Sequence, residues 1–152
     1  MSYKIRFYPE LCVACGACSV ACMDQNDILV QEGMQPFRHV YQTEYCDGAG
    51  KMHIGYYSAA CEHCDDAPCI DACPVNCLSK DLQTGFTVFD TADCTGCGSC
   101  SGACPHNVPA IDANGKMVKC DGCNERVKAG YLPACVMVCP YDALKLEELQ
   151  GR

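Results

Sequence analysis

Cysteine is the feature that most constrains this chain. It supplies 18 of the 152 residues, a proportion of about 12%, at which a short chain is expected to be a disulfide or metal scaffold. Leu, Ile, Val and Phe together make up only 28 residues, and the formal net charge is -8. Such a composition is typical of a chain that does not fold unaided. We therefore expect the cysteines to organise the fold.

The N-terminal sequence favours metal over disulfides. MSYKIRFYPE has neither a basic segment followed by an apolar one nor a twin-arginine pair, so it does not resemble an export signal, and disulfides persist mainly in exported proteins. No apolar run approaches the roughly 18 residues of a membrane helix. We expect a cytoplasmic protein without direct membrane insertion, with export on a partner's signal left open. The acidic balance argues against nucleic acid as a partner.

Sixteen of the cysteines fall into four groups that repeat along the chain. FYPELCVACGACSVAC, starting at residue 7, and FDTADCTGCGSCSGAC, starting at residue 89, align at all four cysteines. The second and fourth groups share C-x-x-C, a spacer, and then C-x-x-x-C-P. The order compact, split, compact, split indicates duplication of an ancestral pair. The groups are Cys12, Cys15, Cys18 and Cys22; Cys61, Cys64, Cys69 and Cys73; Cys94, Cys97, Cys100 and Cys104; and Cys120, Cys123, Cys135 and Cys139.

The spacing within these groups is typical of [4Fe-4S] ligands. In the bacterial ferredoxin run, three cysteines hold one cube and the fourth reaches a different one. One structural zinc per group is the alternative, but four such runs favour iron and sulfide. Gly16 and Gly98 would let the backbone pass close to inorganic sulfide. Cluster ligation would also supply the folding energy that a small aliphatic core cannot.

The pattern of the remaining residues predicts a loop-rich α+β fold. Alternating apolar residues predict short strands, and a D-G-A-G turn between two such runs predicts a hairpin. Gly130 and Pro133 would end the second of two short helices. The expected strands are residues 4–8, paired with 143–146, and residues 86–89 and 117–119; the hairpin pairs 37–45 with 52–57, and the helices are 17–23 and 125–129.

The chain resembles the electron-transfer (beta) subunit of the dimethyl sulfoxide reductase family. The resemblance rests on the order of the four groups, on K-C-D-x-C-x-x-R from Lys119 to Arg126, and on P-A-C-V-x-x-C-P around the last two cysteines. It covers residues 3–147. Related small subunits serve formate dehydrogenases and nitrate and polysulfide reductases in anaerobic metabolism. The resemblance implies two bicluster ferredoxin-like domains built around four [4Fe-4S] clusters.

The resemblance also implies a function without catalysis. The chain would relay single electrons between a large molybdenum or tungsten pterin catalytic subunit and an external donor or acceptor, with a further redox subunit left open. A free-standing polyferredoxin that docks transiently with several redox partners is the alternative. No nucleotide-binding motif and no nucleophile beside a base is present in the sequence, which agrees with a subunit that is not itself an enzyme.

Domains and ligand sets follow from the same resemblance. The first and fourth groups would share a discontinuous domain, residues 1–35 plus 110–152; the second and third would share residues 58–109, and residues 36–57 would be a hairpin insertion. The implied sets are Cys12, Cys15, Cys18 and Cys139 for cluster 1; Cys61, Cys64, Cys69 and Cys104 for cluster 2; Cys94, Cys97, Cys100 and Cys73 for cluster 3; and Cys120, Cys123, Cys135 and Cys22 for cluster 4.

Two cysteines lie outside the four groups. Cys77 aligns with Ala143 when the second and fourth groups are superposed, so we expect a small buried side chain there. Cys46 lies beside the predicted hairpin turn, where we expect a free thiol. Neither is predicted to bind a cluster.

The first prediction concerns metal content. Anaerobically purified protein should contain about sixteen iron and sixteen sulfide per chain, because four cubes require that number. Iron, acid-labile sulfide and zinc assays on one sample provide the measurement. About four zinc per chain with little iron would exclude the cluster interpretation.

Overall fold

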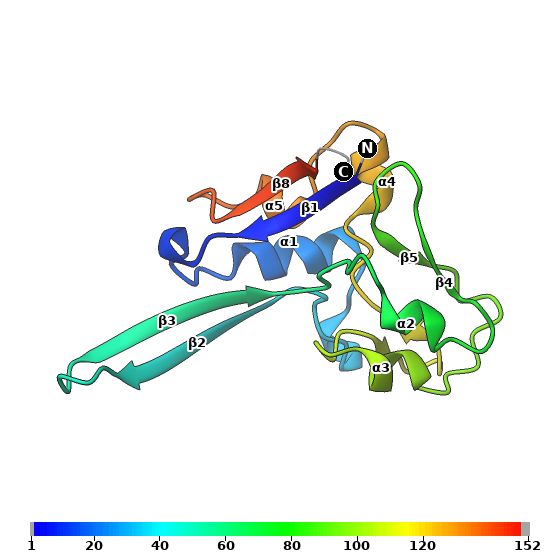
Figure 1. Cartoon of the computed structure of the whole chain (residues 1–152), viewed down its shortest axis with the longest axis horizontal. Helices are drawn as coiled ribbons and strands as arrows, with labels where there is room; N and C mark the ends of the chain where they lie inside the picture. Colours follow the sequence, from blue (N-terminus) through cyan, green and yellow to red (C-terminus); the bar gives the residue numbers. More distant parts are fainter. Residues whose placement is uncertain (1, 150–152) are drawn as a thin grey trace. The chain divides into compact units, whose positions relative to one another are not determined.

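The computed structural model describes residues 2–149 and consists of short strands and helices joined by loops (Figure 1). No helix within this part of the chain is long and apolar enough to cross a membrane. The strands are β1 (Ser2–Phe7), β2 (His39–Cys46), β3 (Met52–Ala59), β4 (Leu78–Lys80), β5 (Thr87–Phe89), β6 (Ala110–Ile111), β7 (Met117–Val118) and β8 (Leu144–Leu149). The helices are α1 (Ala17–Gln25), α2 (Pro68–Asp71), α3 (Ser99–Ala103), α4 (Asn124–Lys128) and α5 (Ala134–Met137), with 3-10 turns η1 (Pro9–Leu11) and η2 (Val30–Glu32).

The strands pair two by two within the described residues: β1 with β8, β2 with β3, β4 with β5, and β6 with β7. The predicted pairing of the first strand with a strand near residue 144 is thereby confirmed, as are the hairpin, the two predicted helices and the strands at 86–89 and 117–119. The sequence did not predict α2, α3 and α5. Each of these helices has only four or five residues, too few to show a helical period.

The chain forms two compact units. One holds residues 2–5, 61–133 and 146–149, and the other holds residues 6–60 and 134–145; we call them the 61–133 unit and the 6–60 unit. Residues 110–133, which the resemblance placed with the first and fourth cysteine groups, belong to the 61–133 unit. Buried Met117 in this segment packs with Leu78 and with Cys69 and Cys100 of the second and third groups. The division into bicluster domains remains a prediction.

Helix α1 packs against α5 in the 6–60 unit, and the β2–β3 hairpin extends from it as the longest pair of strands in Figure 1. The hairpin register runs from His39 opposite Ala59 to Cys46 opposite Met52. Asp47 closes the turn, because its Oδ1 accepts the N–H groups of Ala49 and Lys51, each at 2.9 Å. Such an Asx turn is what the D-G-A-G sequence predicts.

A small apolar core lies in the 61–133 unit, where α2 packs against α3. Leu78 and Met117 pack there with Ala67 and cluster-motif cysteines. Phe86 is fully buried, and its ring faces Gly122 so closely that an added Cβ would lie 2.5 Å from it. Gly122 also has a φ of +76°. Both the ring contact and the left-handed backbone therefore require glycine at this position.

A polar network connects the loop after β4 to helix α4. Thr84 Oγ1 donates to Asn124 Oδ1 at 2.6 Å, and Asn124 Nδ2 donates to Asp81 Oδ2 at 3.1 Å. Lys128 Nζ lies 2.7 Å from the same carboxylate, and this cation holds the pKa of Asp81 well below its usual range. The network orders the segment that follows Cys123.

The close approach of the Phe86 ring to Gly122 leads to a second prediction. Gly122→Ala should destabilise the cluster-loaded protein by about 2–4 kcal/mol, since overpacking against Phe86 adds to the cost of a left-handed alanine. Loss of visible absorption in anaerobic guanidinium titrations measures the effect. Gly102→Ala in α3 is the control, because an added Cβ there meets no atom within 4 Å; it should change stability by no more than about 1 kcal/mol. Equal effects of the two substitutions would contradict the prediction.

Candidate metal-cluster sites

The four C-x-x-C segments share one backbone geometry. In each, the second intervening residue has a left-handed φ: +54° at Ala14, +47° at His63, +67° at Gly96 and +76° at Gly122. The N–H groups of Ala14, His63 and Gly122 donate to the sulfur of the first cysteine of their own segment, at 3.4, 3.5 and 3.4 Å. Alanine and histidine adopt this conformation at a cost of about 1–2 kcal/mol. The loops are therefore shaped to present a sulfur that accepts a backbone hydrogen bond.

Gly16 and Gly98 have a related role one residue after the second cysteine. They begin α1 and α3 with a φ of +76° each. An added Cβ at either position meets no protein atom within 4 Å. Within the protein, glycine is thus favoured only by the backbone conformation, while the expected close pass to sulfide remains a prediction.

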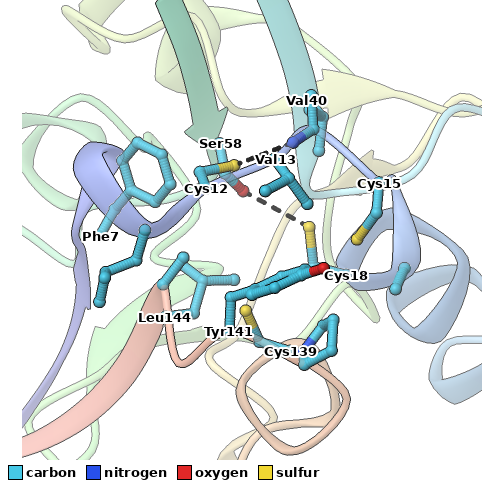
Figure 2. A pocket seen from close by; sticks show the side chains of 16 residues that line it. Phe7, Cys12, Val13, Cys15, Cys18, Val40, Ser58, Cys139, Tyr141 and Leu144 are labelled. Atoms are coloured by element: carbon cyan, nitrogen blue, oxygen red, sulfur yellow. Dashed lines mark hydrogen bonds between the residues drawn. The ribbon is translucent and has the colours of Figure 1, made fainter.

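The first cavity lies in the 6–60 unit and is lined by Cys12, Cys15, Cys18 and Cys139 (Figure 2). Its volume, including open space at the mouth, is about 360 Å³. Figure 2 shows the ring of Tyr141 beside these sulfurs, and Cys18 Sγ lies 3.6 Å from Ser58 Oγ. The structure therefore brings a cysteine of the fourth group to the three cysteines of the first.

Two further cavities lie in the 61–133 unit and repeat this arrangement. The volumes, again including open space, are about 340 and 300 Å³. Each cavity is lined by the first three cysteines of one group and by the fourth cysteine of another group, as in the implied ligand sets. The larger is lined by Cys61, Cys64, Cys69 and Cys104, and the smaller by Cys94, Cys97, Cys100 and Cys73.

The fourth implied set draws on both units. Cys22 on α1 and Cys135 on α5 belong to the 6–60 unit, in which these two helices pack together. Cys120 and Cys123 belong to the 61–133 unit, where Cys120 is buried. The structure places each pair of cysteines within its own unit. That all four bind one cluster remains a prediction.

The surroundings of the thiols act on their pKa values in two directions. Burial raises the pKa of Cys61 to about 11, with the nearby Lys119 opposing the shift, and burial also raises the pKa of Cys69 and Cys100. The N–H groups of Met117 and Gly96 lower the pKa of Cys94. A metal binds the thiolate form of cysteine. Backbone N–H donors lower the thiol pKa and so favour this form. Burial raises the thiol pKa, so that thiolate formation at the buried cysteines depends on the metal.

Cys77 and Cys46 differ in their surroundings. Cys77 is only 7% exposed, so the predicted small buried side chain is confirmed. It also lines the cavity of Cys94 and Cys73, and its N–H donates to Cys73 Sγ at 3.2 Å. Burial, together with these two neighbouring thiols, raises the pKa of Cys77 to about 11. Cys46 is exposed, with its Sγ 2.9 Å from Met52 Sδ, and its role as a free thiol remains a prediction.

Two buried polar residues beside the cysteines were not predicted as functional. His63 Nδ1 accepts a hydrogen bond from the N–H of Thr87 at 3.0 Å. The proton of the neutral imidazole is therefore on Nε2. This nitrogen lies 3.9 Å from Cys120 Sγ. Lys119 lies with its Nζ 3.9 Å from Cys61 Sγ. In the sequence, the signal for His63 is its position between Cys61 and Cys64, and the signal for Lys119 is its position directly before Cys120.

This donor set fits [4Fe-4S] clusters. Each of the three cavities offers four thiols from the cysteine groups, to which Cys77 adds a fifth in the third, together with apolar walls such as Leu144 in the first and Ile111 in the third. Backbone N–H groups already donate to several of the sulfurs, and such hydrogen bonds are among the factors that set cluster potentials. The arrangement can hold one-electron carriers within protein.

Comparison with known proteins agrees with this chemistry. Residues 52–149 match the family model of a 4Fe-4S dicluster domain. The B subunit of the anaerobic dimethyl sulfoxide reductase of Haemophilus influenzae is 38% identical over 151 residues, which cover 93% of this chain and 72% of the relative. Thiosulfate reductase electron transfer subunit PhsB of Salmonella typhi is 36% identical, with 97% and 76% covered. Hydrogenase-2 operon protein HybA of Escherichia coli O157:H7 is 36% identical, with 94% and 51% covered.

The protein belongs to the 4Fe-4S dicluster family that includes the B subunits of anaerobic dimethyl sulfoxide reductases. It is an iron–sulfur electron-transfer protein and not a catalytic subunit. Its cofactors are four [4Fe-4S] clusters, in agreement with the four cysteine groups.

The third prediction separates ligands from bystanders in the cavity that contains five cysteines. Cys77→Ala should leave the iron content unchanged and alter stability by no more than about 1.5 kcal/mol, the scale of a tolerated small core substitution. Cys73→Ala removes an implied ligand four residues earlier and should lower the iron content. Iron assays and anaerobic electron paramagnetic resonance (EPR) spectra of both variants provide the measurement. Iron loss on Cys77→Ala alone would show that the two roles are exchanged.

Proposed function

We propose that this protein relays single electrons between a large molybdenum or tungsten pterin catalytic subunit and an external donor or acceptor. The observation that carries the proposal is the presence of three separate cavities, each lined by four cysteines from two different groups. Four thiolates cap the four irons of a cube, which leaves no open iron for a substrate. Such a site exchanges electrons without binding a substrate.

The ligand sets that we propose are those implied by the sequence: Cys12, Cys15, Cys18 and Cys139; Cys61, Cys64, Cys69 and Cys104; Cys94, Cys97, Cys100 and Cys73; and Cys120, Cys123, Cys135 and Cys22. The first three are supported by the cavities that they line. Two bicluster ferredoxin-like domains are supported by the packing of α1 with α5 and of α2 with α3, because each helix pair joins two cysteine groups.

When bound, the clusters supply one-electron redox chemistry. The residues of the chain hold them in place and control their surroundings. The left-handed loops aim backbone N–H groups at the sulfurs, and apolar side chains such as Leu144 and Met117 limit water at the cavity walls. Fixed donors and reduced solvent access lower the structural change that accompanies a change of charge.

The nature of the partner rests on the relatives. Two of them are named as a chain of dimethyl sulfoxide reductase and as the electron transfer subunit of thiosulfate reductase. A protein that shares more than a third of its residues with both is expected to serve a catalytic subunit in the same way. A further redox subunit and the cytoplasmic location remain expectations.

Anaerobic purification of the tagged protein from its own cells tests this proposal. We expect a large pterin-containing subunit to co-purify in a fixed ratio, and electrons supplied to the complex by dithionite to reach that subunit. A protein that carries its iron but is isolated alone and reduces several unrelated acceptors would indicate a free-standing polyferredoxin. A colourless, zinc-containing protein would exclude both functions.

The fourth prediction tests ligand sharing between distant groups. Cys139→Ser should perturb the same EPR component as Cys15→Ser, because both residues line one cavity. Cys123→Ser is the matched control from the same sequence group as Cys139 and should perturb a different component. If Cys139→Ser and Cys123→Ser changed the same component and Cys15→Ser another, the proposed exchange of ligands would be wrong.

A further inference from the structure

Lys119 is a buried cation beside one of the cavities. It is 1% exposed and lines the cavity of Cys61, Cys64, Cys69 and Cys104. Its Nζ donates to the carbonyl oxygen of Thr87 and, at 2.7 Å, to that of Cys120. It also lies 3.9 Å from Cys61 Sγ and 5.7 Å from the centre of the Phe89 ring. The side chain is thus held in one place by two carbonyl groups and an aromatic ring.

The charge of Lys119 needs a counter-charge. A buried ion without one costs several kcal/mol, so buried charges are normally paired. Among the ion pairs described for residues 2–149, none includes Lys119. Glu62, which lines the same cavity, lies 3.7 Å from Lys4. The four thiolates expected at this cavity are therefore the negative charge that Lys119 faces.

We propose that the Lys119 ammonium raises the reduction potential of the cluster held by Cys61, Cys64, Cys69 and Cys104. The proposal rests on that proposed ligand set. Reduction adds one negative charge to the site, and a nearby cation stabilises the reduced form more than the oxidised form. Because Lys119 is buried, its field is screened less than that of a surface charge. Cluster potentials respond to local charge and to hydrogen bonds at the sulfurs.

A second lysine shows why the effect should be selective. Lys116 Nζ donates to the carbonyl oxygens of Ala92 and Cys94, at 3.3 and 2.8 Å, beside the cavity of the third cysteine group. Lys116 is only partly buried, so water screens its charge. Lys119 does not line that cavity. We therefore expect the cluster of Cys61 to be reduced before the cluster of Cys94.

Three variants of the full, cluster-loaded protein test the proposal. Lys119→Gln removes the charge but keeps a hydrogen-bond donor for the two carbonyl groups, and Lys119→Arg keeps the charge. Lys51→Gln removes the same charge from an exposed position in the hairpin turn and is the matched control. Each is titrated anaerobically by EPR, and Cys64→Ser identifies the component that belongs to this site.

Lys119→Gln should lower the ratio of reduced to oxidised cluster in that component at least tenfold at a fixed potential, a shift of about 59 mV for a one-electron couple. Lys119→Arg and Lys51→Gln should each change the ratio by less than tenfold. An unchanged ratio in Lys119→Gln, or an equal fall in Lys119→Arg, would overturn the proposal.

Loss of the cluster from Lys119→Gln, or an error in the ligand set, is tested with other protein samples. If Lys119→Gln loses its cluster, wild-type protein provides the test: the component identified by Cys64→Ser must titrate above the component identified by Cys97→Ser, and the reverse order overturns the proposal. If Cys64→Ser alters no component, the ligand set itself is wrong, and the inference drawn from it is wrong as well. The identity of the catalytic partner does not enter any of these measurements.

Discussion

Ligation of iron–sulfur clusters by thiolates is the interaction on which the rest of this protein depends. The other stabilising elements are small: within the described residues the sheets have two strands each, and four of the five helices have four or five residues. Isolated two-stranded sheets and such short helices are marginal in water. Cysteines from distant segments meet around shared cavities, so ligand bonds connect segments that little apolar packing holds together. Folding and cofactor binding are therefore coupled.

The protein around the cysteines adjusts their charge as well as their position. Left-handed residues such as Ala14 and His63 turn backbone N–H groups toward sulfurs, while burial opposes thiolate formation at Cys61. Lys119 adds a fixed positive charge beside the same sulfur. Different sites in one protein thereby receive different surroundings from nearly identical motifs, which is what a series of electron carriers needs if their potentials are to differ.

The fold was predictable where local sequence carries a clear signal. The hairpin followed from alternating residues around the turn at Asp47, and α1 followed from the segment after Gly16. Helices α2, α3 and α5 were not predicted from the sequence, because they are too short to show a helical period. The placement of residues 110–133 in the 61–133 unit depends on contacts such as that of Met117 with Leu78, which lie far apart in sequence and have no local signature.

The sequence by itself determined the class of cofactor, because sixteen cysteines at ferredoxin spacing limit the chemistry of the ligands, and the family resemblance supplied the way in which the groups exchange their last cysteines. Tertiary structure decided the surroundings of each site. It brought Cys139 to the cavity of Cys12, buried Lys119 beside Cys61 and placed Cys77 against the cavity of Cys94. Residue type and spacing specify which atoms can bind a cluster, whereas burial and neighbouring charges arise only when distant segments meet.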